Sequence, residues 1–143
     1  MAIDEKTINH LFEYLDGEIK VIEKSQVSLE LFNQDLLVTD ATKYRIQIAV
    51  EMVINIAEHI VAGLKLGQPE HAKDLFPLLA KEKIITEELA GVLGKAVGLR
   101  NILVHRYREV SLPILANSAT IGLNDLRAFA KTVNEFLEKP SQS

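Results

Sequence analysis

The sequence predicts an all-α fold, in which four to five helices form an up-and-down bundle. Apolar residues recur with a period near 3.6 in the long segments, as expected of helices with one buried face. No segment has the pattern of a strand, and the short connections favour antiparallel neighbours. The 143 residues are 48% hydrophobic, enough for a single core. We therefore expect one domain, residues 1–138, and a disordered tail, residues 139–143.

The first helix is expected to begin after Asp4, whose carboxylate can cap it, and to end at the polar residues near Ser25. A short turn over residues 29–33 follows. The second helix begins at Asp35 or near residues 39–40, which the sequence does not decide, and ends near Lys65. Its expected apolar row is Tyr44, Ile48, Met52, Ile56 and Ile60. Its expected polar row is Lys43, Gln47, Glu51, Asn55, Glu58 and His59.

The third helix is expected over residues 74–83, and Pro77 is tolerated in its first turn. Thr86 then caps a fourth helix, whose early acidic residues complement the helix dipole. After a break at residues 110–113, Ser111 can cap the last helix. Within it, residues 117–124 (NSATIGLN) are poor helix formers, so a kink or local fraying is expected there.

Composition excludes several classes of function. The chain has no cysteine, so disulfides, thiolate metal sites and a cysteine nucleophile are excluded. A formal net charge of −4 argues against non-specific binding of nucleic acid through a broad positively charged surface. We see neither a signal-peptide pattern nor a segment that approaches a membrane span, and we expect a soluble cytoplasmic protein. None of the four histidines follows a glutamate by three residues, so no metal is predicted, and no cofactor.

The segment that ends the fourth helix reads RNILVHRY, from Arg100 to Tyr107. On one continuous helix these two residues would lie within about 20° of each other. Asn101, His105 and Arg108 would lie roughly 80° to 140° further round. The pattern therefore predicts that a cation, an amide, an imidazole and a phenol face one shared space.

That set of groups suits metal-free cleavage of an RNA phosphodiester. Arg100 can bind the phosphate and the charge that develops on it, while His105 can take or return a proton near neutral pH. Three further cations near the motif are candidates for RNA binding, namely Lys95, Arg106 and Arg108. The plainer alternative is a solvated helix face whose cations only complement the dipole of a helix C-terminus.

Gly94 and Gly98 share the helix face of Asn101 and His105, which lets another helix approach closely. That helix would belong either to the same chain or to a second subunit related by a two-fold axis, and we favour the second. With a second copy nearby, Glu51 or Asn55 would orient the arginine or the histidine.

Residues 100–107 resemble the signature of the HEPN superfamily, specifically its HepT-like toxins. Residues 44–57 (YRIQIAVEMVINIA), 76–89 (FPLLAKEKIITEEL) and 125–129 (DLRAF) are similar to the corresponding HepT segments. The likeness covers about 100 residues, from residue 39 to residue 137. Residues 117–124 depart from it, because the family usually has better helix formers there.

The resemblance implies a symmetric homodimer and a metal-independent endoribonuclease, the toxin of a type VII toxin–antitoxin system. Arg100 would bind the scissile phosphate, His105 would act as general acid or base, and Asn101 would support them. The substrate would be RNA and not DNA; tRNA and mRNA are the natural candidates, although the sequence does not identify the RNA that is cleaved. The implied partner is a minimal nucleotidyltransferase antitoxin, which transfers AMP from ATP to Tyr107.

Other interpretations stay open at this point. Tyr107 can simply pack or form a hydrogen bond at the helix end. The chain can be a non-catalytic HEPN scaffold that binds a nucleotide or a nucleotidyltransferase, since a helical bundle supports many functions. A structural helical dimer with a chance motif is the third interpretation.

Overall fold

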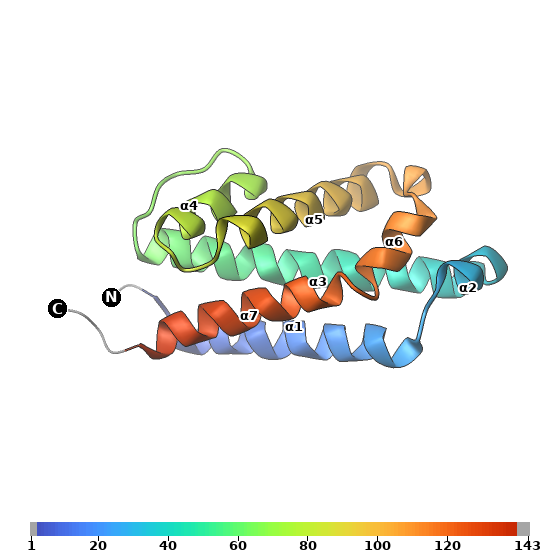
Figure 1. Cartoon of the computed structure of the whole chain (residues 1–143), viewed down its shortest axis with the longest axis horizontal. Helices are drawn as coiled ribbons and strands as arrows, with labels where there is room; N and C mark the ends of the chain where they lie inside the picture. Colours follow the sequence, from blue (N-terminus) through green and yellow to red (C-terminus); the bar gives the residue numbers. More distant parts are fainter. Residues whose placement is uncertain (1–2, 140–143) are drawn as a thin grey trace.

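The structure, a computed structural model, describes residues 3–139. Four long helices run alternately up and down, and they are α1 (Glu5–Ser25), α3 (Leu36–Gly63), α5 (Glu87–His105) and α7 (Leu123–Glu138) (Figure 1). Shorter elements occupy the connections: α2 (Leu29–Gln34), η1 (Ala72–Asp74), α4 (Leu75–Lys81), η2 (Tyr107–Glu109) and α6 (Leu112–Ser118). The predicted all-α bundle is confirmed.

Side chains at the expected positions cap four of these helices. Each accepts a hydrogen bond from the backbone N–H three residues later, at 3.0 to 3.3 Å, and the caps are Asp4, Asp35, Thr86 and Ser111. Such a cap typically stabilises a helix by about 1 kcal/mol. The bond to Asp35 settles the start of α3, which the sequence left open.

The central helix of the bundle is α3, which packs against α1, α2, α4, α5, α6 and α7. The rings of Phe76 in α4 and Phe129 in α7 are fully buried and pack edge to face, with centroids 6.0 Å apart. By length and composition α3 is apolar enough to cross a membrane, contrary to the expectation that no segment approaches a span. Half of its most apolar stretch is buried among the other helices, which accounts for that composition.

The rows predicted for α3 are partly wrong. Tyr44, expected on the apolar row, is 57% exposed, whereas Lys43, expected on the polar row, is buried. Because helices cover α3 on several sides, its buried residues do not form a single row. Lys43 is also held in place by a hydrogen bond to the backbone oxygen of Tyr107.

Several helices end earlier than expected. Lys65 and Lys83 adopt left-handed backbone conformations, with φ of 54° and 59°, which end α3 at Gly63 and α4 at Lys81. The predicted last helix is divided in two, α6 and α7. A Cβ atom at Gly122 would lie 2.8 Å from the Cα of Ser118, so the turn between them requires glycine. The tail expected to be disordered lies, apart from Lys139, outside the described residues.

Candidate functional site

The helix that carries the motif ends at His105, earlier than the pattern predicts. The backbone of Arg106 leaves the helical conformation, with φ −139° and ψ 50°, and its N–H donates to the oxygen of Ile102 at 2.7 Å. The next residues form the turn η2. The expectation that Tyr107 and Arg108 continue the α5 helix, with Tyr107 on the edge of Arg100, is therefore wrong.

Arg100 faces the interior side of α5. It lines a cavity of about 470 Å³ together with α3 and the connection between α3 and α4. Glu58, Glu70 and His71 line the same cavity, so two acidic residues and an imidazole share it with the guanidinium. The Nε atom of Arg100 is buried and has no hydrogen-bond partner among residues 3–139. A buried donor of this kind can complete its hydrogen bonding with an acceptor that enters the cavity.

Asn101 and His105 lie on the outer face of α5, where both are exposed. The same face carries Gly91, Gly94 and Gly98, and a Cβ atom at any of them would meet no atom within 4 Å. No helix of the same chain therefore covers this face in the described structure. The structure therefore gives no support to close packing by a helix of the same chain as the reason for these glycines.

Arg100 and His105 point to different sides of α5, because five helical residues correspond to about 140° of rotation and about 7.5 Å of rise. His105 is not among the residues that line the Arg100 cavity. A single chain thus does not gather the predicted groups in one space.

Tyr107 is held by two residues of α3. Its hydroxyl donates to Oδ1 of Asp40 at 2.9 Å. The ammonium of Lys43 lies 4.2 Å from the centroid of the tyrosine ring, and it donates to the Tyr107 backbone oxygen at 3.3 Å. The side chain still remains 37% exposed. The residue is therefore both anchored, as the plainer interpretation expects, and reachable from solvent.

The environment of Tyr107 keeps its hydroxyl protonated. Burial, and then the hydrogen bond and negative charge of Asp40, raise its pKa to about 12. At neutral pH the phenol does not ionise without a base.

Sequence reasoning missed Asp40 and Lys43. Both lie in the early turns of α3, where the start of the helix was undecided, and they are separated from Tyr107 by 67 and 64 residues. Their spacing of three residues does place them on one helix face, but that pattern is common. Glu58 and His71 were also not expected beside Arg100.

Glu51 and Asn55, which were expected to orient the motif if a second copy packs nearby, are placed by the structure only within a single chain. The carboxylate of Glu51 accepts a hydrogen bond from Gln47 at 3.1 Å. Neither Glu51 nor Asn55 lines the Arg100 cavity, where Glu58 stands instead. Among residues 3–139, no three His, Cys, Asp or Glu side chains come together as metal ligands.

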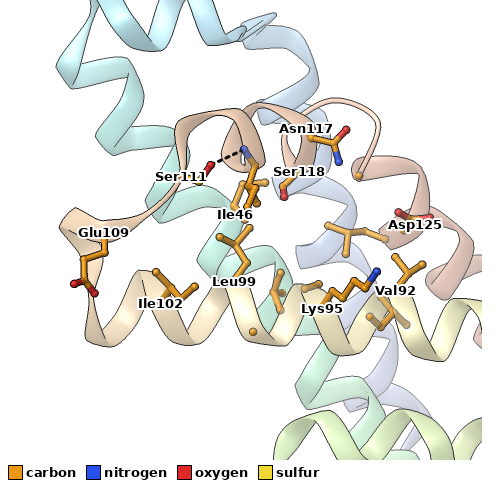
Figure 2. A pocket seen from close by; sticks show the side chains of 17 residues that line it. Ile46, Val92, Lys95, Leu99, Ile102, Glu109, Ser111, Asn117, Ser118 and Asp125 are labelled. Carbon is orange, nitrogen blue, oxygen red and sulfur yellow. Dashed lines mark hydrogen bonds between the residues drawn. The ribbon is translucent and has the colours of Figure 1, made fainter.

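The candidate RNA-binding cations are all exposed. Arg106 and Glu109 form a solvent-exposed ion pair at 3.6 Å, which contributes little to stability. Lys95 lines a mostly apolar cavity of about 730 Å³ between α5, α3 and the α6–α7 region. Figure 2 shows Lys95, Leu99 and Ile102 along α5 on one side of this cavity, with Ser118 on the other.

Comparisons with known proteins agree with the resemblance to HepT-like toxins. The family model "Ribonuclease HepT-like" matches residues 8–133. The chain is 36% identical to the "mRNA nuclease HepT" of Shewanella oneidensis over 115 residues, which cover 80% of this chain and 86% of that protein. It is 28% identical to the "tRNA nuclease HepT" of Aphanizomenon flos-aquae over 138 residues, which cover 95% and 90% respectively.

A solved structure shows the same arrangement of helices. It contains the tri-AMPylated HEPN toxin of Shewanella oneidensis in complex with its MNT antitoxin. The toxin superimposes with a TM-score of 0.83 at 34% identity, over 90% of this chain and 96% of that one. Sequence and fold together therefore place this chain in the HepT-like family of ribonucleases.

Proposed function

We propose that the chain is the toxin of a toxin–antitoxin pair and acts as a metal-independent endoribonuclease in the cytoplasm. The single observation that carries the proposal is the arginine–histidine motif at the end of α5. In this motif, the Nε of Arg100 is buried and has no hydrogen-bond partner in the described residues, and His105 is exposed to solvent. The names of the HepT relatives as mRNA and tRNA nucleases support an RNA substrate.

The chemistry follows from the two groups. The guanidinium of Arg100 would bind the scissile phosphate and stabilise the charge that develops on its oxygens. His105 would take the proton of the 2′-hydroxyl or return one to the leaving 5′-oxygen. Asn101, on the same exposed face as His105, would help to position that histidine.

A homodimer would assemble the complete site. The open glycine face of α5 supports this, because a second α5 can approach it closely. Packing two copies around this face would bring two His105 side chains to one cleft. Arg100 of each copy would bind the phosphate of RNA that reaches its own cavity.

A nucleotidyltransferase antitoxin would neutralise the toxin by transferring AMP to Tyr107. The partial exposure of this tyrosine supports the proposal, because an antitoxin can reach it from solvent. The AMPylated toxin in the Shewanella oneidensis toxin–antitoxin complex also supports it. An added adenylate is bulky and anionic, so it would obstruct RNA and repel its phosphates beside Arg106 and Arg108.

Cleavage of RNA by the purified chain tests the proposal. The wild-type chain should cut bacterial total RNA in the presence of EDTA, and His105→Ala should lower the rate by about 10²-fold or more. His10→Ala, which removes an exposed histidine of α1, is the matched control. Intact RNA after incubation with folded wild-type chain would contradict the ribonuclease.

A further inference from the structure

We propose that Asp40 is the general base for nucleotidyl transfer to Tyr107, so that the toxin supplies part of the machinery for its own modification. This inference rests on the proposed neutralisation by AMP transfer. It assigns a role to a residue of α3 that lies outside the motif in sequence and touches the oxygen that would react.

The first support is geometric. The Tyr107 hydroxyl points its hydrogen at Oδ1 of Asp40 across 2.9 Å, which is the distance that proton transfer requires. Because the hydrogen occupies one direction around the oxygen, a lone pair is left for attack on an electrophile. The side chain is 37% exposed, so a partner can reach this oxygen from solvent.

The second support is that the tyrosine needs a base. Its raised pKa, about 12, leaves almost no phenolate at neutral pH. The carboxylate of Asp40 accepts the shorter hydrogen bond of this hydroxyl, at 2.9 Å, and the backbone oxygen of Asp40 lies 3.5 Å away. A carboxylate in that position removes the proton as the new bond forms, without a free phenolate.

Lys43 completes the arrangement. Its ammonium lies over the tyrosine ring, 4.2 Å from the ring centroid, and donates a hydrogen bond to the backbone oxygen of Tyr107. Lys43 thus contacts both the side chain and the backbone of Tyr107. Since Asp40 and Lys43 both belong to α3, the central helix of the bundle, they present the tyrosine on a rigid support. Such pre-orientation of a nucleophile lowers the barrier of the transfer.

The step balances as follows. The oxygen of Tyr107 forms a bond to the α-phosphorus of ATP bound by the nucleotidyltransferase partner. The bond from that phosphorus to the oxygen bridging to the β-phosphate breaks, and pyrophosphate leaves. The phenolic proton passes to the carboxylate of Asp40 and from there to water.

The test is the rate at which the nucleotidyltransferase antitoxin transfers label from [α-³²P]ATP to the purified toxin. Asp40→Asn keeps an oxygen that can accept the hydrogen bond but removes the base, and should slow labelling about 100-fold at neutral pH. Asp40→Glu should recover part of the rate. Glu109→Gln removes an exposed carboxylate from the same turn as Tyr107, one that does not contact the tyrosine hydroxyl, and should label at the wild-type rate.

The pH profile separates a base from a structural contact. For Asp40→Asn the labelling rate should rise about tenfold per pH unit, because only the spontaneously ionised phenol reacts, whereas the wild-type rate should vary much less. Labelling of Asp40→Asn at the wild-type rate and with the wild-type pH profile would overturn the inference. A uniformly slower rate with an unchanged profile would also overturn it, since Asp40 would then only position the ring.

RNA cleavage distinguishes this inference from the proposed function. Asp40→Asn should still cut RNA, because Arg100 and His105 are unchanged, but it should resist neutralisation by the antitoxin. A wild-type chain that cuts RNA but takes no label would overturn the neutralisation and the inference together, and leave the ribonuclease standing. A wild-type chain that takes label but leaves RNA intact would overturn the ribonuclease alone.

Discussion

The hydroxyl of Tyr107 donates a hydrogen bond to Oδ1 of Asp40, which lies 67 residues earlier in the chain. This contact joins the turn after the motif helix to the first part of α3. The oxygen that would receive AMP is thus positioned by the central helix of the bundle rather than by the motif itself. Consequences of this contact can be measured without the antitoxin.

The pKa of Tyr107 should be raised. Burial and then Asp40 shift it from 10.0 to about 12, so the folded state favours the neutral phenol. Its contribution to stability is complete below pH 10 and is lost as the pH rises through the folded pKa near 12. Ultraviolet titration of a Tyr14→Phe, Tyr44→Phe variant would report Tyr107 alone, since the chain has three tyrosines.

Asp40→Asn should lower the titration midpoint of Tyr107 toward the ordinary pKa of a tyrosine, because it removes the negative charge that opposes ionisation of the phenol. If Tyr107 titrates near 10 in the Tyr14→Phe, Tyr44→Phe variant, which retains Asp40, the hydrogen bond between Tyr107 and Asp40 would be contradicted.

Self-association should depend on the glycine face of α5. Gly98→Gln places a long side chain in open space, so the chain folds normally but a second copy can no longer approach. We expect a dimer for the wild type and a monomer for Gly98→Gln by light scattering at micromolar concentration. Gly17→Gln on α1, which also meets open space, is the matched control and should remain dimeric. A dimer for all three chains would place the interface elsewhere.

Arg106 and Arg108 should contribute to RNA affinity through phosphate contacts. In the cleavage-deficient His105→Ala background, replacing either arginine by alanine should weaken binding of single-stranded RNA. It should also reduce the slope of log affinity against log salt concentration by about 0.7. Lys6→Ala, which removes an exposed cation of α1, should change neither. Unchanged slopes for both arginine variants would remove these residues from the interface.

The sequence predicted the bundle well where the signals are local. Asp4, Thr86 and Ser111 cap their helices as the pattern indicates, because a cap depends only on residues three positions apart. The break in the last helix is also encoded locally, since Gly122 occupies a turn that admits no Cβ atom.

The site was less predictable because it depends on contacts between distant segments. The helical wheel assumed that the helix continues to Tyr107, whereas α5 ends at His105, and Asp40 and Lys43 hold the tyrosine outside the helix. Lys43 reads as a surface residue in sequence, and its burial arises from its contacts with the ring and backbone of Tyr107. Periodicity alone carries no information on such pairs.

Induction of the chain in bacterial cells without any antitoxin tests the central claim most directly, with RNA integrity read from the same cultures. We expect growth arrest and RNA fragments for the wild type, and normal growth with intact RNA for His105→Ala and Arg100→Ala. Tyr107→Phe should still arrest growth, because the tyrosine serves neutralisation and not cleavage. Normal growth and intact RNA from soluble wild-type protein would contradict the ribonuclease and favour a scaffold that binds a nucleotidyltransferase.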